Sequence, residues 1–414
     1  MDAYGNLLVN GQPFLWISGQ KTDYWWWTAA GYTLDQTTAK LGAMASNGVN
    51  VMNDGNWGLF NGAYQDTLLW QNFGIYWAGS AVLDDQGHNA QANWADTGTI
   101  TTIVNEFKSR PNLLRWYIAT ELNPEAATTY PTNQPAYGTA VAAIGTADPA
   151  HPVTGDLTVF DTGFNTWIMP SLDAAPVVEE SMGYPSTGIT IQHIMDAVFS
   201  MRDAWNAGQR FVAGISLTPI PELNQALPST YPAISVAELV RAYFWPIALN
   251  VKTFEVLWGA NQRTYSGGNI GDAALPAGAQ QTWSNTLTAL SMVRAMQPII
   301  LAPGRFAPVP TTPAFTIPTS FCNNVRSISG IYAAEKQVGT TLYVVAVNVN
   351  EAGCQVGYPA GYNDTPVSGA TIDVGSSIVS VTRMFEGGSP SFSGSVITDD
   401  FSAMGVHVYK ISLQ

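Results

Sequence analysis

Short apolar runs alternate with longer amphipathic stretches over the first three-quarters of the chain. The apolar runs have the length of buried strands, and the stretches between them carry apolar residues at helical spacing. Strands that alternate with helices are typical of a parallel sheet with crossover connections. Eight such strand–helix units in succession predict an α/β fold, the (β/α)8 TIM barrel. A doubly wound sheet is the second interpretation, because it rarely needs so many units in a row.

The predicted strands are rich in branched and aromatic residues. They cover residues 14–18, 49–53, 73–77, 114–120, 153–159, 177–182, 211–217 and 253–258. The helices predicted between them cover residues 33–47, 64–71, 99–110, 134–144, 166–172, 191–207, 236–249 and 280–296.

The pattern changes after Gly304, where four prolines occur between residues 308 and 318. Alternating, β-branched runs follow at residues 343–349, 378–384 and 405–411, and Gly and Asn separate them. Such runs predict a small antiparallel β-sandwich. We therefore expect a barrel domain over residues 1–305 and a sandwich over residues 306–414.

Composition narrows the class of ligand. Charged residues make up only 11% of the 414 residues, and the formal net charge is −14. The chain therefore lacks the basic surface that nucleic acids or anionic membranes require, and no run approaches the ~20 apolar residues of a membrane span. The 14 tryptophans favour a neutral carbohydrate partner, because indole rings stack on sugar rings. The oligomeric state cannot be read from the sequence.

Metal and cofactor chemistry has no clear signal. The four histidines are far apart and show no paired ligand spacing, so we expect neither a histidine-based metal site nor a cofactor. A Ca²⁺ site built from loop Asp and carbonyl oxygens is the open alternative. A P-loop and a G-x-S-x-G motif are both missing. The two cysteines, Cys322 and Cys354, predict one disulfide and a secreted protein, and two buried thiols are the alternative.

Glu121 is the clearest catalytic candidate. Barrel enzymes carry their chemistry at the carboxyl ends of the strands, and Glu121 ends the apolar run in RWYIATELNPE. Strand alternation puts Tyr117, Ala119 and Glu121 on one side. The alternative role for Glu121 is a surface residue that caps the next helix.

The stretch RPNLLRWYIATELNPE resembles the fourth strand of clan-A glycoside hydrolases. One branch of that clan has a pattern close to hP-x-h-h-x-W-Y-h-x-D-E-P, whose Glu is the acid/base. The matching residues are Pro111, Leu113, Leu114, Trp116, Tyr117 and Glu121. Thr120 stands where the family commonly has Asp or Asn. The resemblance implies that Glu121 is the acid/base of a divergent glycosidase.

Other segments resemble the same family in the same order. They are NLLVNGQPFLWISG, ADPAHPV, SMGYPS, AELVRAYFWPIALNVKTFEVLWG, LYVVAVNVN, VTRMFEGG and DDFSAMGVHVYKI. The resemblance implies a polysaccharide-degrading hydrolase with a C-terminal β-sandwich, in which Trp258 forms the floor of a sugar subsite.

The second carboxylate is less clear, although glycoside hydrolysis usually needs two. The resemblance implies a Glu at the end of strand seven, but that strand ends with Ser216 and Thr218, and Glu222 lies further into the loop. Strand six offers Glu179 and Glu180, which face opposite ways.

We expect Glu180 or Glu222 to be the second carboxylate, with Glu180 preferred because it lies on a rigid strand. Glu255 lies within strand eight on the face opposite Trp258. Retention or inversion stays open, because it depends on the distance between the two carboxyl groups.

Side chains at the other strand ends are candidates for substrate binding. They are Asp54, Trp57, Trp77, Tyr184, Trp258 and Asn261. An Asx-turn is the alternative role for Asp54.

Three functions fit these observations. The first is a glycoside hydrolase that uses paired carboxylates. The second is a carbohydrate-binding barrel that lost its nucleophile, which the missing strand-seven Glu supports. The third is a structural or virion-type surface protein, which the low charge would suit.

Overall fold

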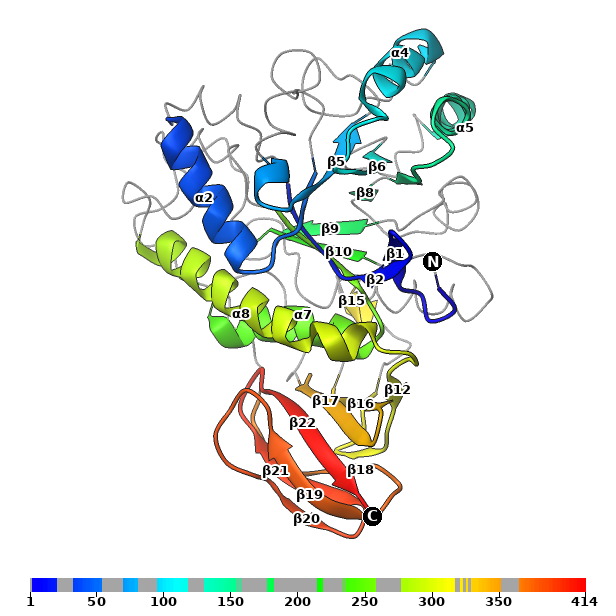
Figure 1. The fold of residues 1–414 in the computed structure, drawn as a ribbon. Coiled ribbons are helices and arrows are strands. Elements are labelled where there is room, and N and C mark those ends of the chain that lie inside the picture. Colours follow the sequence, from blue (N-terminus) through cyan, green and yellow to red (C-terminus); the bar gives the residue numbers. More distant parts are fainter. Residues whose placement is uncertain are drawn as a thin grey trace.

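The computed structural model describes residues 2–20, 33–53, 70–80, 95–117, 130–154, 156–157, 177–181, 214–218, 233, 235–257, 277–316, 321–322, 325–326, 329–350 and 365–414. A parallel sheet lies in the first three-quarters of the chain, and two antiparallel sheets lie in the last quarter (Figure 1).

The parallel sheet joins its described strand segments in the order β7-β6-β5-β4-β3-β11-β10-β9-β8. Their bounds are β3 Trp16–Gln20, β4 Val51–Asn53, β5 Tyr76–Ser80, β6 Leu113–Tyr117, β7 Val153–Thr154, β8 Asp156–Leu157, β9 Val177–Ser181, β10 Gly214–Thr218 and β11 Thr253–Leu257. One residue separates β7 from β8, which are the two ends of this order. The chain therefore closes the sheet into a barrel in which β7 and β8 form the fifth strand, which confirms the predicted TIM barrel.

Helices cover the outer face of this sheet. The described ones are α2 Leu34–Ser46, α4 Thr97–Phe107, α5 Tyr130–Ala147, α7 Val236–Ala248 and α8 Ala277–Leu301. Capping boxes at Thr33 and Ser235 start α2 and α7, which explains why these two helices begin within one residue of their predicted starts.

A hairpin precedes the barrel. Its strands are β1 Leu7–Val9 and β2 Gln12–Phe14. The turn residues Asn10 and Gly11 both have positive φ, 51° and 76°. This is the backbone that a two-residue hairpin turn needs, and Asn-Gly adopts it readily.

Two antiparallel sheets form the C-terminal sandwich, as predicted. One has the order β12-β16-β17-β22-β19, with bounds Ala307–Pro308, Ile331–Val338, Thr341–Asn348, Val406–Leu413 and Ile378–Arg383. The other has the order β13-β18-β21-β20, with bounds Thr311–Thr312, Val367–Asp373, Val396–Phe401 and Ser391–Ser393. A small separate hairpin pairs β14 Phe321–Cys322 with β15 Val325–Arg326. Apolar residues from both large sheets form the sandwich core.

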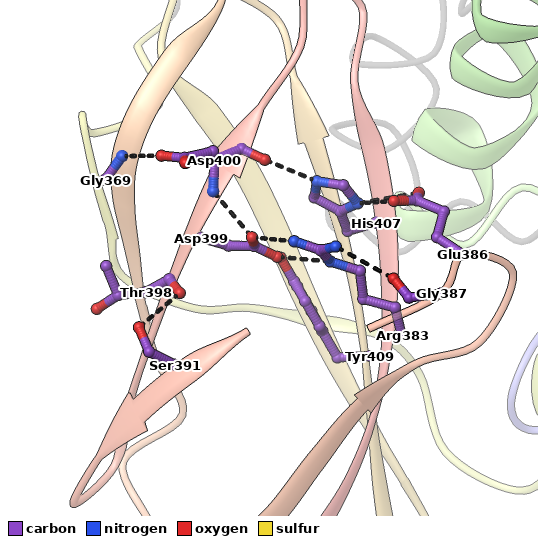
Figure 2. A network of polar contacts seen from close by, with 10 residues as sticks. All are labelled: Gly369, Arg383, Glu386, Gly387, Ser391, Thr398, Asp399, Asp400, His407 and Tyr409. Atoms are coloured by element: carbon purple, nitrogen blue, oxygen red, sulfur yellow. Dashed lines mark hydrogen bonds and ion pairs between the residues drawn. The ribbon is translucent and has the colours of Figure 1, made fainter. Parts of the chain in front are cut away.

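A polar network crosses the sandwich between β19, β21 and β22 (Figure 2). Arg383 Nε donates to Asp399 Oδ2 at 2.9 Å, and Arg383 Nη2 donates to Asp399 Oδ1. Tyr409 Oη donates to Asp399 Oδ2 at 2.8 Å. Burial opposes ionisation of Asp399, but the hydrogen bonds from Arg383 and Tyr409 outweigh it, so the pKa of Asp399 lies below its ordinary value. The network therefore joins the two sheets through a charged, fully bonded carboxylate.

The barrel and the sandwich share one apolar cluster. Helix α7 lies against β16, β17 and β22 of the sandwich (Figure 1). Phe244 of α7 meets Phe385 edge-on, with the ring centroids 5.8 Å apart. Lys336 of β16 donates to the carbonyl of Ile300 at the end of α8 at 2.9 Å. In the part of the chain that the structure describes, no helix is long and apolar enough to cross a membrane.

Candidate active site

Alternate residues of each barrel strand face the interior, and Trp16 and Ser18 of β3 mark that face. Trp16 belongs to a buried cluster with Val51 of β4 and Ala78 of β5, whereas Ile17 belongs to the larger cluster of the helix layer. Register partners on neighbouring strands lie on the same face of a sheet. The interior positions of the other strands therefore follow from β3.

Bulky side chains fill the interior at the amino ends of the strands. Leu7, Val9 and Phe14 of the hairpin pack against the cluster around Trp16. The guanidinium of Arg115 lies over the Trp16 ring, 3.5 Å from its centroid, and Arg115 is 1% exposed. This floor thus contains a buried cation held by a cation–π contact.

A register shift between β5 and β6 brings Arg115 inward. Trp77 pairs with Leu113, but the next residue, Ala78, pairs with Arg115. Leu114 is the extra residue of this bulge, and it also packs in the interior cluster. The bulge reverses the parity of β6, so that Arg115 falls on the interior face.

Two rows of register partners run across the interior, and we name them the first and the second row. The first row consists of Trp16, Thr253, Gly214, Val177 and Asp156. The second row lies two residues nearer the carboxyl ends and consists of Ser18, Glu255, Ser216 and Glu179. Barrel interiors are usually filled by Val, Ile and Leu. By backbone register, three positions of these rows carry acidic residues, namely Asp156, Glu179 and Glu255.

Buried polar groups also lie between β3 and β11. Ser18 Oγ, Thr253 Oγ1 and Trp16 Nε1 are buried and have no hydrogen-bond partner within the described part of the structure. Leaving such a group unsatisfied costs about 1–3 kcal/mol. Native proteins keep few of these groups, and functional sites are among the places where they occur.

The register gives the sheet positions of the two glutamates of strand six. Glu180 pairs with Leu217, and Leu217 pairs with Val256, so Glu180 occupies the outward face of the sheet. Glu179 occupies the interior face. The alternation of a single strand shows only that the two residues face opposite ways, and the neighbouring strands are needed to tell which face is the interior.

Trp77 does not lie where we expected it. It is the second residue of β5 instead of the last residue of its strand, and it is fully buried. Its ring meets Phe107 of α4 at 5.7 Å and Trp116 of β6 at 6.1 Å. A Cβ at Gly79 would lie 2.5 Å from the Trp77 ring, so the indole lies directly over Gly79. Trp77 is therefore a core residue of the helix layer, contrary to the expectation that it binds substrate.

The start of β5 explains this difference. The predicted strand began at residue 73, but residues 73–74 form a turn in which Gly74 has a φ of 68°. The strand therefore starts three residues later than predicted, and Trp77 falls near its beginning.

The remaining predicted site residues lie outside the described residues. They are Glu121, Glu222, Asp54, Trp57, Tyr184, Trp258 and Asn261. The described part of strand four ends at Tyr117, four residues before Glu121. Cys354 of the predicted disulfide is also outside the described residues.

The ADPAHPV segment lies at the opposite, amino-terminal end of strand five. Asp148 Oδ2 accepts from Trp116 Nε1 at 2.8 Å and contacts His151 Nδ1 at 2.7 Å. Burial alone would raise the pKa of Asp148, but the hydrogen bonds from Trp116 and His151 outweigh it. The pKa of Asp148 therefore lies below its ordinary value. Residues at this end of a barrel stabilise the fold, so this segment anchors Trp116 and lies away from the candidate site.

Metal ligands do not cluster in the described ranges, where no group of three or more His, Cys, Asp or Glu side chains could hold an ion.

No protein-family model matches the sequence, and no curated protein matches it. Solved structures do match over nearly the whole chain. A glycoside hydrolase family 5 protein from Bacteroides vulgatus is 13% identical, with a TM-score of 0.61 over 99% of this chain and 92% of that chain. A second structure, named glycoside hydrolase, is 12% identical, with a TM-score of 0.60 over 100% of this chain and 96% of that chain.

A more distant similarity extends to α-amylases. The α-amylase from Geobacillus thermoleovorans, complexed with acarbose, is 8% identical, with a TM-score of 0.53 over 97% of this chain and 98% of that chain. At such identities the likeness establishes the fold, which is a (β/α)8 barrel followed by a C-terminal β-sandwich.

Proposed function

We propose that this chain is a glycoside hydrolase that cleaves a neutral poly- or oligosaccharide, with Glu121 as the general acid/base. The observation that carries the proposal is the acidic interior face of the barrel. Carboxyl-bearing residues occupy interior positions on three strands, at Asp156, Glu179 and Glu255. Acidic residues at such positions, where barrel strands usually carry Val, Ile and Leu, support a functional site.

The chemistry follows from what two carboxyl groups can do. One protonates the oxygen of the leaving sugar, and the other attacks the anomeric carbon or activates a water molecule. Glu121 follows strand four, at the end of the barrel where such enzymes carry their catalytic groups.

The likeness to solved glycosidases supports the same function. Both the glycoside hydrolase family 5 structure and the α-amylase match over barrel and sandwich together. The match to the α-amylase structure, complexed with acarbose, supports a carbohydrate partner for this chain. The high tryptophan content and low charge of the chain agree with a neutral sugar ligand.

The test compares the wild type with Glu121→Gln on a panel of neutral polysaccharides, with reducing ends as the readout. Glutamine keeps the size of the side chain but cannot donate the proton, so product release should fall by at least about 100-fold. Glu125→Gln is the matched control, because it changes another glutamate of the same segment and should leave the rate unchanged. Equal release by the wild type and Glu121→Gln would contradict the role of Glu121.

A carbohydrate-binding barrel is the second candidate, and strand seven favours it. The interior positions of β10 are Gly214, Ser216 and Thr218, so its described part carries no carboxylate. This candidate predicts that the wild type binds a polysaccharide in affinity electrophoresis and releases no sugar from it. Release that Glu121→Gln abolishes would exclude this candidate.

A further inference from the structure

We propose that His407 of β22, in its doubly protonated form, is a pH-sensitive clasp that holds the segment after β19 against the barrel. This segment comprises residues 384–388, and we name it the clasp segment. The inference does not depend on the proposed glycosidase function, because it rests on contacts within the sandwich and between the sandwich and α7.

Both ring nitrogens of His407 face acceptors (Figure 2). Nδ1 lies 2.9 Å from the carboxylate of Glu386, and Nε2 lies 3.0 Å from the backbone carbonyl of Asp400. A carbonyl oxygen cannot donate a hydrogen, so the bond to Asp400 needs a hydrogen on Nε2. The Glu386 side chain is 42% exposed, and water favours the ionised carboxylate, which only accepts. A neutral imidazole has one N–H, so only the imidazolium donates to both groups at once.

Packing holds the imidazole in this orientation. The side chain of His407 is 9% exposed. The Phe401 ring lies beside it with the ring centroids 4.5 Å apart, and the Tyr409 ring lies at 5.9 Å. The imidazole therefore cannot turn away from an acceptor without moving these neighbours, and loss of a proton acts directly on the contact with Glu386.

The charged surroundings of His407 leave Glu386 to it. The titratable groups that face it are Tyr409 on its own strand, Glu386 and Arg383 on and after β19, and Asp399 and Asp400 of β21. On the side of β17 its register partner is Ala346, which carries no charge. Arg383 also interacts with the charge of Glu386, but it directs two hydrogen bonds to Asp399. His407 is therefore the cation that donates a hydrogen bond to Glu386.

The clasp segment also touches the barrel. Phe385 meets Phe244 of α7 edge-on at 5.8 Å, and Met384 and Phe385 pack against the apolar cluster that the two domains share. Helix α7 lies between β10 and β11 in the chain, so it belongs to the barrel layer. A change at Glu386 therefore reaches a barrel helix through the adjacent residue, Phe385.

The clasp should close at low pH and loosen as pH rises. While His407 carries both protons, it donates to Glu386 and to the carbonyl of Asp400. Loss of one proton leaves a bare nitrogen opposite an acceptor and removes a hydrogen bond between charged groups. Such a bond shifts an equilibrium between closed and open forms by at least about 10-fold. Histidine is the side chain that ordinarily changes charge between pH 5 and 8, so the response belongs to that range.

His151 provides a matched comparison within the chain. Its Nδ1 also lies beside a carboxylate, 2.7 Å from Asp148 Oδ2. That bond uses one ring nitrogen, and a neutral imidazole with its hydrogen on Nδ1 can make it. His151 therefore keeps this contact without a second proton.

The test is hydrogen exchange of the full chain, read by mass spectrometry at pH 5.5 and 8.5 in peptides that cover the clasp segment. Rates are corrected for intrinsic exchange, and peptides of β18 report global unfolding. Opening in the wild type should be at least about 10-fold more frequent at pH 8.5. Glu386→Ala should open as often at pH 5.5 as the wild type does at pH 8.5. His407→Gln should show no pH response, and His151→Gln should behave as the wild type does.

The link to the barrel is tested in the same experiment. Peptides of α7 should exchange faster at pH 8.5 than at pH 5.5, and Phe385→Ala should abolish this difference. Exchange of α7 that does not respond to pH would overturn the claim that the clasp acts on the barrel.

A second measurement reads the protonation state directly. In protein labelled with ¹⁵N at histidine, the signals lost in His407→Gln identify His407. Both of its ring nitrogens should carry a proton at pH 5.5, and Nδ1 should lose its proton over the pH range in which the clasp segment opens. A neutral His407 at pH 5.5, equal opening of the wild type at both pH values, or a pH response that persists in His407→Gln would each overturn the proposal.

Discussion

Arg383 in the sandwich and Arg115 in the barrel are both held by β-strands, but their surroundings differ. Arg383 forms two hydrogen bonds with Asp399, and Tyr409 donates a third to the same carboxylate (Figure 2). The hydrogen bonds with Asp399 raise the pKa of Arg383, because the carboxylate favours the charged guanidinium. The charges of this network are matched by partners that are all visible in the structure.

The described part of the barrel interior differs, because it contains buried hydroxyls without a hydrogen-bond partner in the described ranges. Arg115 lies on the face of Trp16, and the buried hydroxyls of Ser18 and Thr253 have no partner within the described ranges. A fully bonded polar network fixes a single packing arrangement. Unsatisfied buried groups lower stability, so a protein that keeps them has a reason other than stability for doing so. The comparison thus sets a fully bonded polar network in the sandwich against unsatisfied buried hydroxyls in the described part of the barrel interior.

Removing Asp399 should produce the largest loss of stability. Asp399→Ala leaves Arg383 and Tyr409 without their shared acceptor, and breaking a buried pair in this way costs about 3–5 kcal/mol. The free energy of unfolding of the sandwich, measured by urea denaturation at pH 7, should fall by this amount. Asp400→Ala is the matched control, because Asp400 is exposed and its carboxylate accepts a hydrogen bond from Gly369 N at 2.7 Å. An equal loss in both variants would contradict the view that the network is the stabilising element.

Lys252, at the start of β11, should give the barrel a stability that rises with pH. Its Nζ contacts Asn6 Oδ1 at 2.6 Å and the Tyr4 carbonyl at 2.9 Å. Burial, together with the like charge of Lys336, lowers the pKa of Lys252 to about 7, whereas an unfolded lysine has a pKa of about 10.4. Between these two pKa values the unfolded chain holds a proton that the folded chain lacks. The free energy of unfolding therefore rises with pH in this range.

The contribution of Lys252 to the free energy of unfolding should increase by about 3 kcal/mol between pH 7 and 10, at up to about 1.4 kcal/mol per pH unit. The measurement is the difference in unfolding free energy between the wild type and Lys252→Met at each pH, which cancels the other titrating groups. The difference should shift in favour of the wild type as pH rises. A constant difference would show that Lys252 keeps its proton in the folded state. The pH dependence of Asp399 has the opposite sense. Because the pKa of Asp399 is lowered in the folded state, its contribution to the free energy of unfolding is lost as pH falls below about 4.

The elements of the barrel could be predicted because their signals are local. The apolar run at residues 253–258 became β11 at Thr253–Leu257, and the capping residues Thr33 and Ser235 fixed the starts of two helices. The predicted start of strand three was too early, because a turn at Gly74 interrupts an apolar run that continues on both sides of that glycine. An apolar run alone does not reveal where the backbone turns.

The face of each catalytic candidate could not be predicted, because it depends on neighbouring strands. Alternation separates Glu179 from Glu180, but only the pairing with Ser216 and, through it, with β3 shows which one is interior. The bulge at Leu114 makes the same point, since one extra residue reverses the parity of β6.

Removing the Ser18 hydroxyl should have the smallest effect on stability, and this makes it the sharpest test of the comparison. Ser18→Ala takes away a buried donor that has no partner in the part of the chain that the structure describes, so the unfolding free energy should stay within about 0.5 kcal/mol or rise. The same substitution at Ser235 removes the capping bond to Glu238 N and should cost about 1 kcal/mol. Thermal and urea unfolding of both variants give the two values. A loss at Ser18 as large as that at Ser235 would mean that its hydroxyl is bonded in the folded protein, and the barrel interior would then be as fully satisfied as the sandwich.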